Sequence, residues 1–321
     1  MSVFARRGLE LVPSDLTRPG WLSAMSLANL NLLIVHMPVN TQALVEYART
    51  PAWHTLSDDA AARGIDVEWA PHAFADLLPR SEFAAQPDWF RMNLLGERLP
   101  DWNMCASSSP ALDVVRQNAA SLTRLLVPTT HRYYFWSDDG HPWCHCPLCA
   151  RLGPGDQNMI VTNAILDGVR TVDPEAELSG LAYLNTLQPL QHVQPAEGVF
   201  LEYAPIERCF IHSLDDSNCA VNRAERARLE AVLPGHAMAR AQVLEYWLDE
   251  SLFWRTAGRP ESLPRLPFKP EVLERDLQFY ARLGFRSIVS YGVMLGDKYA
   301  SLHGEAPIRQ YGEALMKVTS T

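Results

Sequence analysis

Two adjacent carboxylates and three closely spaced thiols make the segment from Arg132 to Cys149 the most chemically distinctive part of the sequence. It begins with an aromatic run, Arg132 to Trp136, which predicts a β-strand. Asp138, Asp139 and Gly140 then follow, a combination typical of a turn. A carboxylate beyond a strand end can serve general acid–base catalysis, although an Asp-Asp-Gly sequence is also often only a turn.

The three thiols belong to Cys144, Cys146 and Cys149. Three thiolates with a fourth ligand form a closed tetrahedral site for structural zinc. The fourth ligand could come from His141, His145, Cys209 or Cys219. Two alternatives stay open: the cysteines are small buried residues that fix a loop, or Cys144 and Cys149 form a redox pair, for which the thioredoxin-like sequence context is missing.

Composition narrows the classes of partner. The chain has 321 residues, of which 47% are hydrophobic, and its formal net charge is −9. It lacks the basic segments that bind nucleic acid or an anionic membrane surface, so neither partner is expected. The first residues lack the apolar core of a signal peptide, and the apolar run from Leu27 to Met37 is too short to span a bilayer. We therefore expect a cytoplasmic protein whose six cysteines are thiols or metal ligands rather than disulfides.

Short apolar runs alternate with segments of helical periodicity along the chain. Eight strands are expected, at residues 8–12, 32–36, 65–72, 132–136, 178–183, 198–203, 242–247 and 286–292. Helices are expected at residues 21–30, 41–63, 110–126, 157–172, 222–233 and 270–283. This alternation predicts an α/β fold, a single (β/α)8 TIM-type barrel that occupies residues 1–321 as one domain. A long elaborated loop, residues 73–128, follows strand three, and the Cys-rich loop follows strand four.

Barrel active sites lie at the carboxyl ends of the strands, so residues near those ends are the candidate site. Aromatic side chains stack on the apolar face of a sugar ring, and carboxylates bind its hydroxyls or transfer protons. The candidate substrate-binding residues are His36, Trp69, His72, Trp136, Tyr183, Tyr203, Tyr246, Trp247 and Tyr291. Each aromatic residue taken alone could simply pack against a loop, but together they favour a carbohydrate pocket.

The candidate catalytic carboxylates are Asp138, Asp139, Glu202 and Glu245. Asp138 and Asp139 are adjacent, so only one of them faces the barrel mouth unless the turn reorients the other. We favour Asp139 as the acid catalyst, with Glu245 or Glu202 as its partner, although Glu202 could equally point outward. No cofactor is required for this chemistry.

Several phrases of the sequence resemble the bacterial DUF4838 family. They include residues 86–90 (QPDWF), 101–105 (DWNMC) and 137–140 (SDDG) with the cysteine cluster, followed by 180–183 (GLAY) and 244–246 (LEY). The family is similar to TIM-barrel glycoside hydrolases, and some relatives are endo-acting β-N-acetylglucosaminidases. The resemblance implies that Asp139 matches the family's aspartate, that Asp138 stands where asparagine is more usual, and that Tyr291 stands where many members have an acidic residue.

These observations predict a glycoside hydrolase that acts on an oligosaccharide or glycoconjugate. The alternative is a degenerate barrel that binds carbohydrate without hydrolysing it. The presence or absence of a facing pair of carboxylates distinguishes the two. Oligomeric state is not predicted.

Overall fold

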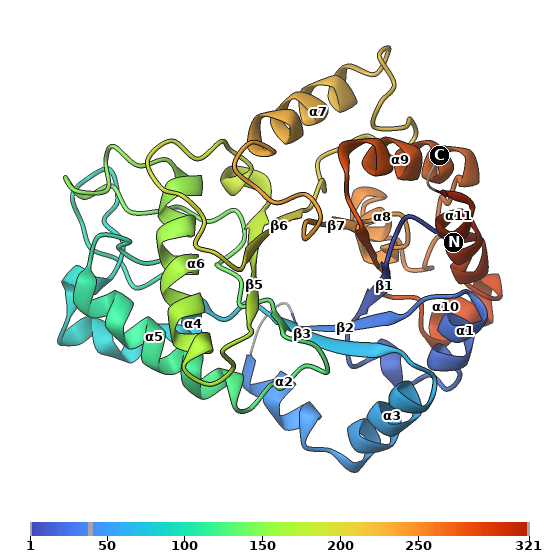
Figure 1. The fold of residues 1–321 in the computed structure, drawn as a ribbon, viewed down its shortest axis with the longest axis horizontal. Coiled ribbons are helices and arrows are strands. Elements are labelled where there is room, and N and C mark those ends of the chain that lie inside the picture. Colours follow the sequence, from blue (N-terminus) through green and yellow to red (C-terminus); the bar gives the residue numbers. More distant parts are fainter. Residues whose placement is uncertain (1, 38–40, 320–321) are drawn as a thin grey trace.

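A parallel β-barrel surrounded by helices forms the centre of the computed structural model, which describes residues 2–37 and 41–319 (Figure 1). Its eight strands pair in parallel in the order β3-β2-β1-β8-β7-β6-β5-β4. They are β1 (Arg6–Leu11), β2 (Leu32–Met37), β3 (Asp66–Pro71), β4 (Arg132–Tyr133), β5 (Glu177–Ala182), β6 (Val199–Tyr203), β7 (Gln242–Glu245) and β8 (Ser287–Tyr291). The predicted (β/α)8 architecture is confirmed.

The barrel closes weakly between its two end strands, β3 and β4. The only ladder contact described between them is a parallel bridge between His72 and Trp136, just beyond both strands. It is held by the amide of Trp136, which donates to the carbonyl of Pro71 at 3.1 Å, and by that of Ala73, which donates to the carbonyl of Trp136 at 3.0 Å. Strand four was predicted to run to Trp136, but β4 ends at Tyr133. Asp139 therefore lies in a loop beyond the strand.

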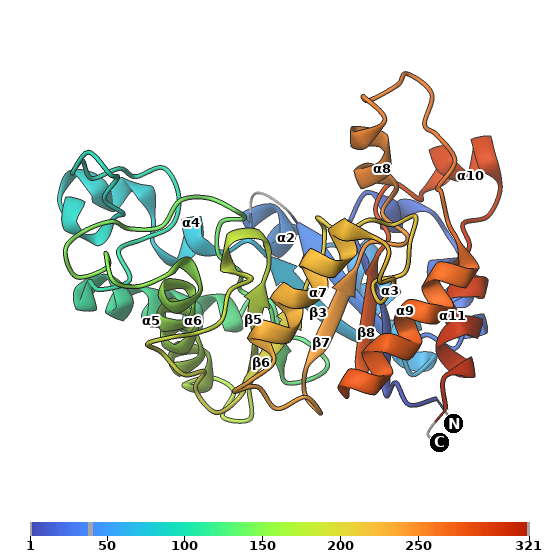
Figure 2. The same cartoon turned by 90° about the horizontal axis from the view of Figure 1, so that it is seen from above.

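Helices cover the outside of the barrel, and the two termini lie close together at one end (Figures 1 and 2). The α-helices are α1 (Trp21–Leu27), α2 (Thr41–Ala48), α3 (Pro51–Ala62), α4 (Phe74–Leu77), α5 (Ser109–Thr123), α6 (Pro154–Arg170), α7 (Ala220–Val232), α8 (Glu250–Thr256), α9 (Pro270–Leu283), α10 (Asp297–His303) and α11 (Ile308–Lys317). None of the helices in the described part of the chain has the length and apolar character needed to cross a membrane.

Two differences from the predicted helices have local causes. The segment 41–63 forms two helices because Pro51 begins the second one, with the Thr50 hydroxyl accepting a hydrogen bond from the Trp53 amide at 3.1 Å. The helix α8 was not predicted, although Asp249 caps it by accepting from the Leu252 amide at 3.2 Å. Figure 2 shows α8 and α10 projecting together from one end of the barrel, away from the termini.

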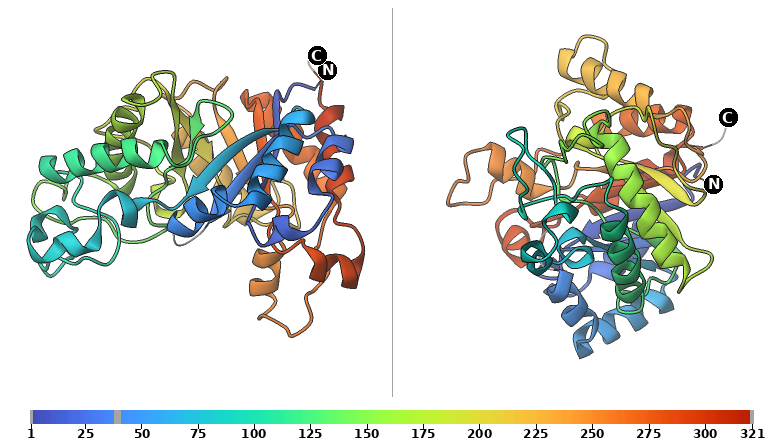
Figure 3. Two further views of the ribbon diagram at one scale, coloured as in Figure 1. Left: turned by 90° about the horizontal axis from the view of Figure 1, so that it is seen from below. Right: turned by 90° about the vertical axis from the view of Figure 1, so that its left-hand side faces the viewer.

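The long segment between β3 and β5 extends to one side of the barrel (Figure 3, cyan to green). It contains α4, the short 3-10 helices Arg80–Ala84 and Pro87–Trp89, α5 and the Cys-rich loop. The helices α5 and α6 pack closely there, since a Cβ added to Gly168 would overlap the Arg116 carbonyl. The predicted elaborated loop is thus partly helical, and together with the Cys-rich loop it forms a lobe beside the barrel.

Candidate active site

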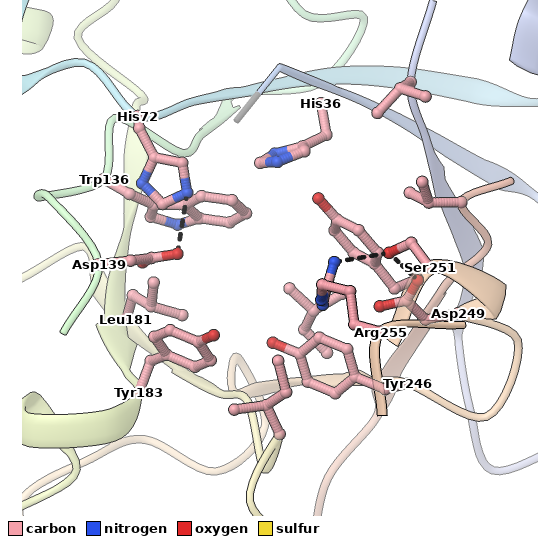
Figure 4. A pocket seen from close by; sticks show the side chains of 15 residues that line it. His36, His72, Trp136, Asp139, Leu181, Tyr183, Tyr246, Asp249, Ser251 and Arg255 are labelled. Carbon is pink, nitrogen blue, oxygen red and sulfur yellow. Dashed lines mark hydrogen bonds and ion pairs between the residues drawn. The ribbon is translucent and has the colours of Figure 1, made fainter. Parts of the chain in front are cut away.

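A pocket of about 340 Å³ opens at the carboxyl ends of the strands (Figure 4). Each of the eight strands, or the loop that follows it, contributes to the wall, as expected for a barrel active site. The lining residues are Val12, His36, His72, Trp136, Asp139, Leu181, Tyr183, Ile206, Leu244, Tyr246, Asp249, Ser251, Arg255, Tyr291 and Val293. The volume lies at the low end of the range for ligand pockets.

One wall of the pocket carries a histidine–aspartate pair. His72 Nε2 lies 3.2 Å from an Asp139 carboxylate oxygen, and His72 Nδ1 lies 2.9 Å from the Ser137 carbonyl oxygen. A carbonyl oxygen only accepts hydrogen bonds, so Nδ1 carries a proton that it donates to Ser137. When the His72 ring is protonated, Nε2 therefore carries the second proton and donates it to Asp139.

The environment of His72 favours keeping that proton. Burial lowers the pKa of His72, but Asp139, the Ser137 carbonyl and the charge of Asp138 together outweigh burial and raise the pKa above its ordinary value. The Asp139 side chain is 40% exposed and faces the pocket. The pair can therefore hold a proton at the wall of the pocket.

The opposite wall carries Asp249, Ser251 and Arg255, which come from the loop after β7 and from α8 (Figure 4). An Asp249 carboxylate oxygen accepts a hydrogen bond from the Ser251 hydroxyl at 2.6 Å, and Arg255 donates to that hydroxyl at 3.1 Å. Burial raises the pKa of Asp249, an effect that Ser251 and Arg255 partly oppose. The pocket thus has a carboxylate on each of two opposing sides.

Below this level, His36 lines the pocket and Glu10 is buried beside it. His36 Nδ1 donates to the Ala70 carbonyl at 2.8 Å and lies 3.3 Å from a Glu10 oxygen. Glu10 is fully buried, and neither of its carboxyl oxygens has a hydrogen-bond partner among the described residues. Burial raises the pKa of Glu10 well above its ordinary value, with Glu202 and Asp139 adding to the effect. Burial likewise lowers the pKa of His36, so it favours the uncharged form of both side chains.

Six of the nine predicted substrate-binding residues line the pocket: His36, His72, Trp136, Tyr183, Tyr246 and Tyr291. The other three face the surrounding helices. Trp69 packs on Trp53 of α3 at a ring distance of 4.4 Å. The Tyr203 hydroxyl donates to Glu225 of α7 at 3.0 Å, and the Trp247 indole donates to Asp276 of α9 at 3.1 Å. Trp69, Tyr203 and Trp247 thus serve the packing of helices on the barrel and are not part of the pocket.

The adjacent aspartates point in different directions. Asp139 faces the pocket, whereas Asp138 accepts from Arg80 at 2.9 Å, and its amide donates to Asn103 at 3.1 Å. Burial raises the pKa of Asp138, an effect that Arg80 partly opposes. Asp138 thus ties the loop after β4 to the lobe that follows β3.

The structure does not bring Glu202 to the pocket. It lies inside the barrel beneath the Trp136 ring, where it accepts hydrogen bonds from the Trp136 indole at 3.0 Å, from Ser179 at 2.5 Å and from Gln242 at 2.8 Å. Burial raises the pKa of Glu202 to about 7. Its carboxylate therefore supports Trp136 from below.

Glu245 faces away from the pocket and is fully buried. It accepts from Arg208 at 2.6 Å and from the Tyr280 hydroxyl at 2.5 Å, and Arg208 also contacts Asp276 at 2.7 Å. This network joins β7 to α9 and to the loop after β6. The structure gives Glu245 a packing environment, in contrast to its predicted role as the catalytic partner.

The cysteine cluster has a different fourth member from those predicted. The sulfurs of Cys105, Cys144, Cys146 and Cys149 all lie within 4.8 Å of one another and are buried. Cys105 Sγ is 3.7 Å from Cys146 Sγ and 3.9 Å from Cys149 Sγ. The amides of Met92 and Cys146 point at Cys144 Sγ, at 3.3 and 3.4 Å. Four convergent thiols with amide donors could hold a metal ion, and none of the four predicted fourth ligands is part of this group.

Comparison with known proteins identifies the family. The model of the family described as "Domain of unknown function (DUF4838)" matches residues 40–312, most of the chain. The chain belongs to the DUF4838 family. This confirms the resemblance inferred from the sequence. No match was found among curated proteins.

Solved structures similar to this DUF4838 chain include glycoside hydrolases. A GH42 β-galactosidase from G. stearothermophilus matches with a TM-score of 0.55 and 13% identity, over 99% of this chain and 57% of that one. The DUF4838 chain thus spans little more than half the length of that enzyme. A family 5 glycoside hydrolase from Prevotella bryantii B14, solved with a xyloglucan tetradecasaccharide, matches with a TM-score of 0.51 and 11% identity over 99% of both chains. At such identities the likeness shows the fold alone.

Three polar lining residues of the DUF4838 chain, Asp249, Ser251 and Arg255, were not predicted from the sequence, and neither was Glu10, which lies beside His36. Glu10 was hidden in the apolar run GLELV, where a single acidic residue is itself a signal. Asp249 lies four residues beyond β7, and the sequence Asp-Glu-Ser before an apolar helix is a recognisable helix start. Because Asp249 lies beyond the strand end, the sequence did not predict it as a pocket residue.

Proposed function

We propose that this protein hydrolyses a glycosidic bond in the pocket at the carboxyl face of the barrel. The observation that carries the proposal is the pair of opposed acidic walls, His72–Asp139 on one side and Asp249 on the other, with aromatic rings between them. Glycoside hydrolysis needs a carboxylic acid beside the leaving oxygen and a second carboxylate at the sugar ring.

The catalytic roles follow from which side chains can hold a proton and which are ionised. The His72–Asp139 pair holds a proton facing the pocket and gives it to the leaving oxygen from Asp139. Asp249 supplies the second carboxylate, which the nearby Arg255 guanidinium helps to keep ionised. Trp136, fixed from below by Glu202, and Tyr183 offer ring faces for the apolar side of a sugar. An oligosaccharide or glycoconjugate is the substrate class that this combination fits.

One observation favours the second candidate, a barrel that binds carbohydrate without hydrolysing it. At the ends of β4 and β7 the pocket is lined by Trp136 and Tyr246, both aromatic, while the carboxylates stand further out in loops. Loop carboxylates are less rigidly placed than groups on strands. In this case the aromatic rings would bind sugar, and the acid pair would not be aligned for reaction.

A substrate screen distinguishes the two candidates. The purified protein is incubated with a panel of aryl glycosides and N-acetylated oligosaccharides, and product release and binding are both measured. Hydrolysis of at least one substrate, inhibited by the free sugar that it releases, is the expected result. Binding of a sugar without release of product from any member of the panel would favour the second candidate.

For the cysteines we propose structural zinc held by Cys105, Cys144, Cys146 and Cys149. All four are buried, and four thiolates form the closed coordination typical of structural zinc. The ion would tie residue 105, near the start of α5, to the loop after β4, and so would hold the loop that carries Asp139. The zinc ion would take no part in the hydrolysis. We propose that the whole chain forms a single catalytic domain.

Elemental analysis of protein purified without chelator tests the zinc proposal. About one tightly held zinc ion per chain is expected, and C105S should lose it and unfold at a lower denaturant concentration, since zinc binding contributes to folding. Protein that contains no metal, or a C105S variant that retains the zinc, would contradict the assignment.

A further inference from the structure

A second group of metal-ligating side chains lies in the loop between β6 and α7. It consists of Cys209, His212 and Cys219, whose ligand atoms all lie within 4.8 Å of one another. Cys209 Sγ is 3.4 Å from His212 Nδ1. None of the three lines the pocket or belongs to the buried cysteine cluster. In a tetrahedral zinc site, bond lengths of about 2.3 Å to sulfur and 2.0 Å to nitrogen place these atoms about 3.5 Å apart.

The backbone of this loop is fixed by Asn222, a fully buried residue of α7. The side-chain oxygen of Asn222 accepts from the Cys209 amide at 2.7 Å. Its nitrogen lies within donating distance of the carbonyls of Cys209 and His212, each at 3.0 Å, and of Ser213 at 2.9 Å. Arg208 also donates to the His212 carbonyl at 3.0 Å. The two ligands in the loop are therefore held in position by groups that are not ligands, as is usual for metal sites.

The third ligand and the exposure of the group define its character. Cys219 is the N-cap of α7, so the third ligand comes from the start of that helix. Cys219 is buried, Cys209 is half-buried and His212 is exposed. A metal ion bound here would thus keep one coordination position open to solvent, unlike an ion enclosed by four buried cysteines.

We propose that Cys209, His212 and Cys219 form a solvent-open site for a soft divalent transition metal, best suited to zinc, with water as the fourth ligand. Two thiolates and one imidazole are the donors that zinc prefers, and three protein ligands with one open position are typical of accessible zinc sites. The ion would link the loop after β6 to the start of α7. Because Ile206 of the same loop lines the pocket, the ion would also restrict one wall of the pocket.

Cobalt titration of the reduced full-length protein tests this site, since tetrahedral cobalt with thiolate ligands absorbs visible light. The wild-type chain is expected to bind two ions, one tightly at the four cysteines and a second more weakly. H212Q and C209S should weaken the binding of the second ion by at least ~10-fold, since loss of even an outer-sphere partner typically has that effect. Both variants should bind the first ion like the wild type. C105S should weaken the binding of the first ion and leave the binding of the second unaltered. Because His212 is exposed, H212Q is expected to fold normally.

His192 provides a matched control, since it is exposed and belongs to neither group of ligands. H192Q should bind both ions like the wild type. The proposal is overturned if the wild type binds a single ion that C105S removes, or if H212Q binds the second ion as tightly as the wild type. It is also overturned if mass spectrometry of unreduced protein finds Cys209 and Cys219 joined in a disulfide. None of these results depends on whether the protein hydrolyses a sugar.

Discussion

At the scale of single residues, the proton shared by His72 and Asp139 determines the expected pH dependence of catalysis. The pKa of His72 is raised, so the pair keeps its proton above the pH at which free histidine loses it, and activity falls only as the pH rises through that raised value. The pKa of Asp249 is also raised, so activity on the acid side is lost at a higher pH than for an ordinary aspartate. A bell-shaped profile of kcat/KM is the expected result, with its acid limb above pH 3.8 and its alkaline limb above pH 6.5.

The variant H72Q identifies which limb belongs to the pair. Glutamine can still donate to the Ser137 carbonyl but cannot carry a proton for Asp139, so the alkaline limb should move to lower pH while the acid limb stays in place. An alkaline limb identical to that of the wild type would mean that another group supplies the proton.

At the scale of secondary-structure elements, Glu245 holds β7 against α9 through Arg208 and Tyr280. E245Q should lower the free energy of unfolding by about 3 kcal/mol, because breaking a buried ion pair leaves Arg208 with only Asp276 as a charged partner. The kcat of the folded enzyme should stay close to that of the wild type. Urea unfolding and steady-state kinetics on the same preparation measure both quantities.

Glu207 offers a matched control for this change, since its side chain is 57% exposed where it pairs with Arg228. E207Q should alter the free energy of unfolding by less than ~1 kcal/mol. If E245Q instead lost activity with unchanged stability, Glu245 would be catalytic, as the sequence suggested.

The elements also show what the sequence could predict. Apolar runs bounded by turn residues located all eight strands, because a parallel strand in a barrel is buried on both faces. Because both faces of each strand are buried, the sequence does not reveal which side chains point into the barrel and which point toward the helices. The sequence QVLEYW does not reveal that Leu244 and Tyr246 face the pocket while Glu245 and Trp247 face the helices, and for this reason three aromatic residues and Glu245 were wrongly placed in the pocket.

At the scale of the whole molecule, contacts between distant segments were the least predictable. Cys105 joins cysteines about forty residues later only because the lobe after β3 folds back on the loop after β4. The opposition of Asp139 and Asp249 likewise requires closure of the barrel, which brings the loops after β4 and β7 to either side of one pocket. Neither the contact between the cysteines nor the opposition of the two aspartates can be inferred from residue spacing along the chain.

The buried carboxyl of Glu202 should make the stability of the whole molecule depend on pH. Its pKa rises from 4.5 to about 7 on folding, so between these values the folded chain retains a proton that the unfolded chain has lost. The contribution of Glu202 is thus present below pH 4.5 and is lost as the pH rises through 7, at up to about 1.4 kcal/mol per pH unit. E202Q should remove this contribution. Urea unfolding at several pH values gives the slope of the free energy of unfolding against pH for E202Q and for the wild type. Equal slopes for the two proteins would contradict the prediction.

The measurement that most directly tests the pocket as a hydrolytic site is the turnover of D139N, D249N and the double variant on a substrate of the wild-type enzyme. Asparagine is nearly isosteric with aspartate but provides no acidic proton, so D139N should lose at least ~100-fold in kcat with its thermal unfolding and sugar binding close to wild type. D249N should lose a comparable factor, and the double variant little more than either single one, because both groups serve one transition state. Full activity of D139N on that substrate would contradict the account.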